Sequence, residues 1–161
     1  MRIHLAADHA GYTLGQAILA QLTEAGHYVS YHGADAHDDG DDYPAFSIKA
    51  AQAVIDDEDS GLDVRGIIVG SSGAGESITA NKVNGIRAVP GQSVEFVRLA
   101  RSQADATIVT LGAALQDAAA ALAIVDAFVS TAFEVDPDDV RRIIHTAEYE
   151  NAGTIEGWMV E

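Results

Sequence analysis

Short apolar runs alternate with helical periodicity along most of the chain. The strand-like runs occupy residues 2–7, 28–32, 66–70, 86–89 and 107–112. The apolar positions between and after them recur every three or four residues and predict helices over 12–25, 44–56, 76–81, 93–102, 117–130 and about 137–150. Gly26 can cap the first helix at its C-terminal end. Asp136 as N-cap and Pro137 in the first turn mark the start of the last helix.

Five β-α units of this kind predict an α/β fold, a single-domain doubly wound (Rossmann-like) five-stranded parallel sheet with helices on both faces. The domain is expected to span residues 1–150. The remaining residues, 151–161, form a C-terminal tail whose Trp158 and Met159 are expected to pack on the body or on a partner subunit. Ligands of such sheets bind beyond the carboxyl ends of the strands, where "DHAGY", "GSSGAGE" and "SVEF" all follow strands.

Charge and composition restrict the class of protein further. The 25 acidic and 9 basic side chains give a net charge of −16, which repels nucleic acid and anionic membranes. The absence of cysteine excludes disulfides, thiolate catalysis and cysteine-ligated zinc. No long uncharged run predicts a membrane span, and residues 1–10 do not have the pattern of a signal peptide. We therefore expect a cytoplasmic protein that binds neither nucleic acid nor membranes.

The loop "GSSGAGE" at 70–76 is the first candidate for chemistry. Glycines at 70, 73 and 75 are expected to take left-handed angles, so that successive N–H groups point inward and bind an anion. A carboxylate beside such a loop would repel a phosphate, but Glu76 fits if the loop stabilises a developing oxyanion while Glu76 removes a proton from the adjacent carbon. The alternative is structural: a tight β-α turn with Glu76 capping the helix.

Four blocks together resemble the family of ribose-5-phosphate isomerase type B and galactose-6-phosphate isomerase. They are "AADHAGY" (6–12), "DDYPAF" (41–46), "GSSGAGESITANKVNGIRA" (70–88) and "ALAIVDAF" (121–128). The resemblance extends over about residues 2–150. It implies an aldose–ketose isomerase for a sugar phosphate that uses no metal or other cofactor. It also implies a homodimer or tetramer with active sites shared across the dimer interface.

The resemblance assigns the reacting end of the site to the glycine loop. Glu76 matches the base of the glutamate-bearing branch of the family, which transfers a proton between C2 and C1 through an enediolate. The residues that match the anion-binding loop around O1 and O2 are Ser72, Gly73, Ala74 and Gly75, and the hydroxyl of Ser71 can add a further donor. Glu76, Ser72 and Asp8 are the expected catalytic residues, with Asp8 holding sugar hydroxyls.

Further substrate contacts follow from the same match. His9 matches a histidine at the phosphate end, Tyr43 matches a tyrosine that lines the pocket, and Asn81 belongs to the matching "NKV". Structural alternatives remain for two of these residues: Tyr43 before Pro44 can serve packing alone, and His9 can be structural. Asp8, for its part, can be the N-cap of the helix at 12–25.

Three family positions differ in this chain. A His-Asn block that opens the sugar ring is replaced by "RSQADA" (101–106), where Gln103 aligns with the histidine but cannot donate a proton at neutral pH. An arginine after the next strand is replaced by Ala114. Of two phosphate-binding arginines four residues apart in the last helix, Arg142 is present and the other is Asp138, which we expect to pair with Arg142.

These losses leave three readings open. The first is an isomerase for an open-chain, shorter or differently charged sugar such as a tetrose phosphate. The second is one subunit of a two-chain isomerase whose paralogue supplies the missing side chains. The third is a non-catalytic sugar-phosphate-binding protein. A metal is not expected, because the acidic stretch "YHGADAHDDGDDYP" (31–44) lacks the spacing of a calcium loop and is better interpreted as a solvated loop.

Overall fold

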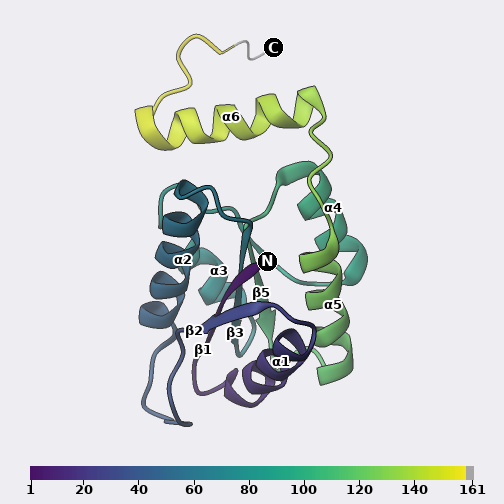
Figure 1. Cartoon of the computed structure of the whole chain (residues 1–161). Helices are drawn as coiled ribbons and strands as arrows, with labels where there is room; N and C mark the ends of the chain where they lie inside the picture. The colour runs from purple at the N-terminus through teal and green to yellow at the C-terminus, as the bar shows by residue number, and fades with distance from the viewer. Residues whose placement is uncertain (159–161) are drawn as a thin grey trace.

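The computed structural model describes residues 1–158 of the chain and contains one sheet covered by helices on both faces (Figure 1). Its elements follow each other as β1 (Arg2–Ala7), α1 (Tyr12–Glu24), β2 (Tyr28–Tyr31), α2 (Tyr43–Asp59), β3 (Val64–Gly70), α3 (Ala74–Ala80), β4 (Ala88–Pro90), α4 (Val94–Ala104), β5 (Ile108–Gly112), α5 (Ala118–Ser130) and α6 (Pro137–Ala152). All four strand pairs are parallel, in the order β2-β1-β3-β5-β4. The predicted doubly wound five-stranded parallel sheet is therefore confirmed.

Alternating side chains of the strands separate the core into two layers. Ile3 and Leu5 of β1 lie on the face that α1, α4 and α5 cover, where Phe128 of α5 is fully buried. Ala6 of the same strand lies on the opposite face, under α2 and α3. Pro90 is accommodated because β4 is an edge strand, where a missing N–H breaks no ladder.

The order in which the chain adds strands reverses between β1 and β3, and this reversal determines where a ligand can bind. From β1 the chain first adds β2 on one side, and then β3 on the other. Neighbouring connections diverge at such a point, which leaves a crevice beyond the carboxyl ends of the two strands. The two segments that leave these ends are the turn at Asp8 and the loop that begins at Gly70.

A group of titratable side chains that no sequence motif indicates links β1, the end of β2 and α2. His4 is buried; its Nε2 donates to Asp57 at 2.8 Å, and its Nδ1 lies 2.8 Å from Nε2 of His32. Arg2 donates to the same carboxylate at 3.0 Å. Burial alone would raise the pKa of Asp57, but the bonds from His4 and Arg2 outweigh it and hold the pKa below its usual value. Burial lowers the pKa of His32, with a smaller contribution from His4.

Arg101 of α4 is buried, although arginines of surface helices are mostly exposed. Its side chain is 1% exposed and donates to the carboxylate of Asp105 at 2.7 Å and to the carbonyls of Ala106 and Thr131 at 2.6 and 3.2 Å. The helical pattern alone does not reveal this, because the segment after α5 covers the last turn of α4: the N–H of Glu134 donates to the carbonyl of Ser102.

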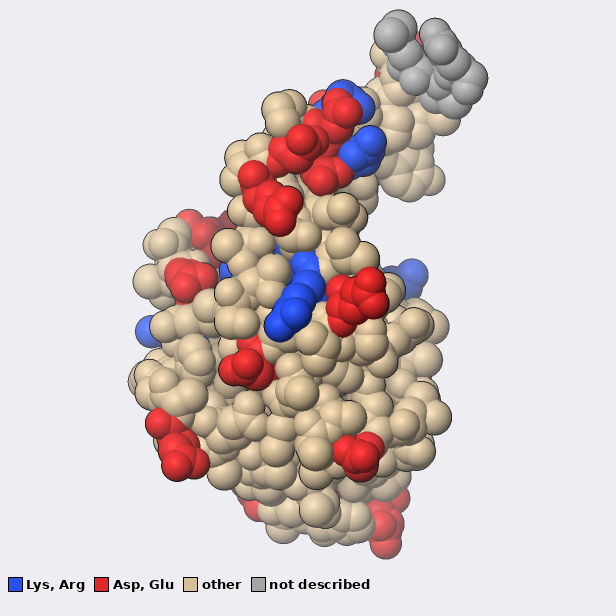
Figure 2. Space-filling model, turned by 90° about the vertical axis from the view of Figure 1, so that its right-hand side faces the viewer, with Lys and Arg blue, Asp and Glu red and all other residues tan. Residues whose placement is uncertain are grey.

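Helix α6 differs from the other helices because it buries none of its residues. It lies across one end of the body, beyond the layers of the sheet (Figure 1). Figure 2 shows acidic side chains, with basic ones among them, gathered along it, above a body surface on which charged groups are scattered. The predicted cap is confirmed, since Asp136 accepts from the N–H groups of Asp138 and Asp139.

The division at residue 150 remains a prediction, as does the packing of the tail. Helix α6 continues to Ala152, two residues into the segment expected to be tail. Trp158 stacks on His145 of α6 with ring centroids 4.6 Å apart, and Met159 lies outside the described residues. Within residues 1–158, no helix has the length and apolar character to cross a membrane.

Candidate active site

The turn after β1 brings Asp8 against the end of β3. The N–H of Asp8 donates to the carbonyl of Val69, and its carboxylate accepts from the N–H of Gly11 at 2.9 Å. A Cβ at Gly11 would lie 2.2 Å from the oxygen of Val69, so only glycine allows this approach. Asp8 is 5% exposed, and it closes the turn before α1 rather than capping the helix directly, because the N-cap is Gly11.

The glycine loop leaves β3 and enters α3 with a single left-handed residue. Gly73 has φ of +77°, whereas Gly70 and Gly75 are absent from the left-handed region, so the expectation that all three take left-handed angles is wrong for two of them. Those two serve close approach instead. A Cβ at Gly70 would lie 1.7 Å from a carboxylate oxygen of Glu76, and a Cβ at Gly75 would lie 2.6 Å from the ring of Tyr43.

Other bonds hold the loop in place. The hydroxyl of Thr110 in β5 donates to the carbonyl of Gly73 at 2.7 Å, and the hydroxyl of Ser72 accepts from the N–H of Ala74 at 3.3 Å. Ser71 and Ser72 are both exposed at the rim. The first amides of α3 have no helical carbonyl before them, so apart from the bond of Ala74 to Ser72 they can bond to an oxygen of a ligand.

Glu76 lies in the first turn of α3 with its carboxylate over Gly70, and the residue is 3% exposed. Burial raises the pKa of this carboxyl; its own backbone N–H opposes the shift, and the charge of Asp8 adds to it. A carboxylate with these surroundings is a stronger base than an exposed one. The N-cap residue of α3 is Gly73, which has no side chain, and the Glu76 carboxyl bonds to its own backbone N–H in the first turn of the helix.

His9 and Tyr43 complete this rim. The ring of Tyr43, the first residue of α2, lies against Gly75, so it forms a wall beside the loop. Nδ1 of His9 lies 2.9 Å from the carboxylate of Asp41 and 3.1 Å from its carbonyl. The bond to Asp41 raises the pKa of His9, against a smaller effect of burial, and Asp8 raises it further. The structure thus brings together Asp8, His9, Tyr43, Ser71, Ser72, Gly73, Ala74, Gly75 and Glu76.

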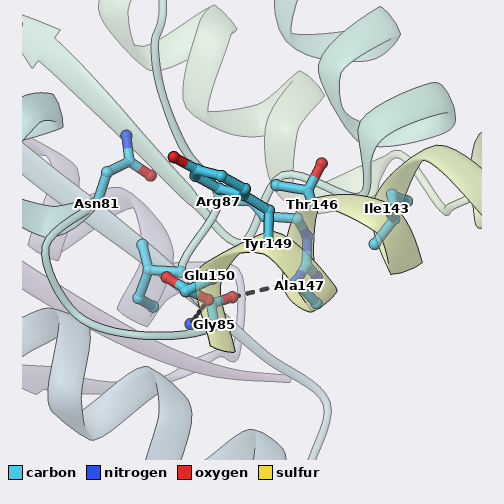
Figure 3. Close-up of a pocket in the computed structure, with 9 residues that line it drawn as sticks. Asn81, Gly85, Arg87, Ile143, Thr146, Ala147, Tyr149 and Glu150 are labelled. Atoms are coloured by element: carbon cyan, nitrogen blue, oxygen red, sulfur yellow. Dashed lines mark hydrogen bonds between the residues drawn. The ribbon is translucent and has the colours of Figure 1, made fainter. Parts of the chain in front are cut away.

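Asn81 is not part of this group. It follows the last residue of α3, and its side chain donates to the carbonyls of Ser77 and Ala88 and accepts from the N–H of Ala88. These bonds use the whole carboxamide to fix the connection between α3 and β4. Figure 3 shows Asn81 beside a different pocket, under α6, where Glu150 accepts from the N–H of Gly85 at 2.8 Å.

Arg142 and Gln103 lie at the other end of the sheet from Glu76. Together they line a pocket with Arg87, which directly precedes β4 and whose N–H donates to Thr107 just before β5. These are the amino ends of the strands, whereas Glu76 lies beyond the carboxyl end of β3. Within one chain, therefore, Arg142 and Gln103 do not reach the rim that carries Glu76.

The expected pair between Asp138 and Arg142 is wrong. Arg142 pairs with Asp139, and Asp138 pairs with Arg141, both three residues apart on the exposed surface of α6. The spacing of three and the spacing of four both place side chains on one helix face, so sequence alone cannot choose between them. Among the residues that the structure describes, no group of three or more His, Asp or Glu side chains is arranged to hold a metal ion.

The sequence of the chain is similar to a known protein family and to individual proteins of known activity. The family model described as Ribose/Galactose Isomerase matches residues 3–145. Ribose-5-phosphate isomerase B of Mycolicibacterium paratuberculosis is 47% identical over 150 residues, which is 93% of this chain and 92% of the relative. The Escherichia coli K12 protein of the same name is 33% identical over 133 residues, 83% of this chain and 86% of the relative.

Solved structures give the same picture. Ribose-5-phosphate isomerase B from Mycoplasma genitalium with bound ribulose-5-phosphate superposes with a TM-score of 0.87 at 30% identity, covering 94% of this chain and 97% of that chain. The Clostridium thermocellum enzyme superposes with a TM-score of 0.87 at 34% identity, covering 96% and 100%. At these identities and coverages, the similarity extends beyond the fold to the whole sequence.

Proposed function

The chain belongs to the ribose/galactose isomerase family and is a sugar-phosphate aldose–ketose isomerase, and on that premise we propose that it interconverts ribose 5-phosphate and ribulose 5-phosphate. The observation that carries the proposal is the buried carboxylate of Glu76 against Gly70, beside the amides of the glycine loop. The names of the relatives and the ribulose-5-phosphate bound by the Mycoplasma genitalium enzyme support the choice of sugar.

We propose that Glu76 is the base. It removes the proton from C2 of the open-chain aldose, and the electrons move toward the C1 carbonyl to form an enediolate. The amides of residues 73–75 and the hydroxyl of Ser72 stabilise the developing charge on the oxygen. Protonated Glu76 then returns the proton to C1, while the proton of the O2 hydroxyl moves to O1 and leaves the ketone at C2. One carboxylate suffices because C1 and C2 of a planar enediol share a face.

Asp8, His9 and Tyr43 are proposed to hold the rest of the sugar. Asp8 accepts from sugar hydroxyls with the carboxylate oxygen that the bond from Gly11 leaves free. His9 binds the anionic end of the substrate, and Tyr43 limits the pocket over Gly75. Asp8 and His9 come from the turn after β1 and Tyr43 comes from the start of α2, and these two segments meet at the same rim.

Completion of the site is proposed to need a second chain. Arg142 and Gln103 share one pocket at the amino ends of the strands, and α6 buries none of its residues within the chain. In a homodimer, the pocket of each chain can lie against the Glu76 rim of its partner, which forms two complete sites per dimer. Asn81 lines the neighbouring pocket beside α6, which shares Arg87 with the pocket of Arg142 and Gln103, and it remains a proposed contact only there. A paralogue as partner is the alternative, because Gln103 cannot donate a proton to open a ring.

The first experiment is proton exchange measured by NMR. The purified chain alone is incubated in D2O with ribose 5-phosphate, erythrose 4-phosphate or galactose 6-phosphate, with Glu76→Gln as the matched control. Deuterium entry at C2 together with ketose formation from ribose 5-phosphate, absent in the variant, is the expected result. Turnover of only the tetrose would replace the proposed substrate, and silence with all three sugars would contradict a self-sufficient isomerase.

The second experiment tests the shared site. Glu76→Gln and Arg142→Gln chains, each inactive alone as homodimers, are mixed after mild dissociation. If one chain supplies Glu76 and the other supplies Arg142, each mixed dimer contains one intact site and one inactive site. At equal mixing and random pairing, half of the dimers are mixed, so about a quarter of the wild-type activity returns. No recovery from dimers proven to exchange would refute a site shared between two chains.

A further inference from the structure

Asp41 controls the histidine at the rim, although the sequence pattern did not distinguish it from the other acidic residues of the loop. One carboxylate oxygen accepts from the backbone N–H of His9 at 2.8 Å and lies 2.9 Å from Nδ1 of its ring. The carbonyl of Asp41 lies 3.1 Å from the same Nδ1. A carbonyl oxygen only accepts hydrogen bonds, so Nδ1 must carry a proton. The tautomer of His9 is thereby fixed.

The surroundings of Asp41 also favour a charged His9. The carboxylate side chain is 11% exposed, and its second oxygen is buried without a hydrogen-bond partner among the described residues. Such an anion is stabilised by a cation at contact distance, and the raised pKa of His9 agrees with this. Because Nδ1–H of the imidazolium is bonded to Asp41, its other N–H, at Nε2, is free to donate to a ligand. Nε2 lies at the opposite edge of the ring, and the side chain is 36% exposed.

The other groups around His9 do not provide this control. Asp8 of the same turn has its carboxylate bonded to Gly11. His37 of the loop stands edge-on to His9 with ring centroids 6.4 Å apart, and Tyr12 of α1 stands edge-on to His37 at 6.0 Å. Asp39 faces His37 at 3.7 Å and is 92% exposed. Across the rim, Tyr43 of α2 and Glu76 of α3 make no hydrogen bond to His9, so among the described residues only Asp41 bonds to its ring.

We propose that Asp41 is a positioning residue that holds His9 as an Nδ1-bonded imidazolium, so that its Nε2–H binds the anionic group of the substrate. The proposal rests on the proposed function for the identity of that group, a phosphate. A rim cation has a clear purpose here, because the chain carries a net charge of −16 and the two arginines of α6 are each paired with an aspartate. Asp8 and Glu76 add negative charge at the same rim.

The test is a double-mutant cycle of Asp41→Asn and His9→Gln. Asparagine keeps an oxygen for the backbone N–H of His9 but removes the charge, so the turn is retained. In Asp41→Asn we expect KM for ribose 5-phosphate to rise roughly tenfold with kcat almost unchanged, the size typical for a weakened hydrogen bond to a charged group. In the His9→Gln background, Asp41→Asn should add no further increase. Asp39→Asn, the same charge change in the same loop, is the control and should behave as wild type.

The imidazole of His9 is followed in parallel by 15N NMR, with its signal assigned by its loss in His9→Gln. Asp41→Asn should return the pKa of His9 toward its ordinary value, whereas Asp39→Asn should not; the carbonyl of residue 41 is kept in both variants, so Nδ1 should stay protonated. An unchanged titration of His9, or an equal rise in KM in the His9→Gln background, overturns the proposal. If Asp41→Asn fails to fold, Asp41→Glu keeps the charge and must preserve the titration. The titration of His9 needs no substrate. A wild-type protein that does not turn over ribose 5-phosphate would therefore refute the proposed function but not the effect of Asp41 on His9.

Discussion

Replacing Glu76 with glutamine should abolish isomerisation and stabilise the fold at the same time. The residue is 3% exposed, and its carboxylate lies over Gly70 with Asp8 nearby. Burial raises its pKa, so the charged form that is needed as base is disfavoured in the folded chain. Glutamine has nearly the same shape and no charge, so it removes this cost without leaving a cavity.

The sign of the effect follows from linkage. A carboxyl whose pKa is raised on folding favours the folded state most at a pH below its ordinary value, and this advantage is lost as the pH rises through the folded value. Each unit of the rise corresponds to about 1.4 kcal/mol at a pH where the group is ionised. In a chain of 161 residues, 1 kcal/mol changes Tm by roughly 2–4 °C, so Glu76→Gln should melt higher by roughly 3–5 °C per unit at neutral pH.

Two measurements check this reasoning. Thermal unfolding of wild type and Glu76→Gln is followed by far-UV circular dichroism between pH 5 and pH 8, and the difference in Tm should widen as the pH rises. Exchange at C2 in D2O should fall roughly 10²–10⁴-fold, the usual contribution of a general base. A variant that melts at or below the wild-type temperature at pH 8 would show that Glu76 is not destabilised by its burial. Surviving exchange would show that another group is the base.

Three further predictions concern the scaffold. Gly70→Ala should lose C2 exchange with an unchanged far-UV spectrum, because its Cβ would lie 1.7 Å from a carboxylate oxygen of Glu76 and must displace it. Arg101→Met should lower the free energy of unfolding by about 3 kcal/mol in urea, the lower end for a broken buried pair, since its partner Asp105 is 29% exposed. Asp57→Asn should destabilise by about 1–2 kcal/mol at neutral pH. Because the pKa of Asp57 is lowered, that loss should vanish as the pH falls below the ordinary carboxyl range.

The sequence predicted the elements well because each is specified locally. Short apolar runs predicted all five strands. Asp136 and Pro137 predicted the start of the last helix at the residue where the structure begins it. The sequence also indicated that the loop needs its glycines at 70, 73 and 75, but among these three only Gly73 has a left-handed backbone angle. Gly70 is needed because another side chain occupies the space of its Cβ, and such a requirement depends on contacts that no local pattern contains.

Tertiary contacts account for the remaining differences. Arg101 stands at a polar position of α4 and is buried only because the segment after α5 returns over it. Asp41 was one acidic residue of a loop interpreted as solvated, and its contact with His9 joins positions 32 residues apart. The resemblance assigned Arg142 and Gln103 to family positions, but their location at the amino ends of the strands follows from the topology and not from that assignment.

The acidic partner of Arg142 does not prevent this arginine from binding phosphate. Arg142 is mostly exposed on α6, and its bond to Asp139 is an ion pair at the surface. Exposed pairs of this kind contribute about 0–1 kcal/mol, because water and salt screen the charges and two side chains lose freedom. A phosphate with up to two charges and three acceptor oxygens can bind the guanidinium through two parallel bonds, so it can displace a single carboxylate at small cost. If Arg142 binds the anion as proposed, Asp138 in place of a second arginine removes one donor, while Asp139 only competes for the donor that remains. That difference makes an additional cation at the rim, His9 held by Asp41, the more important compensation.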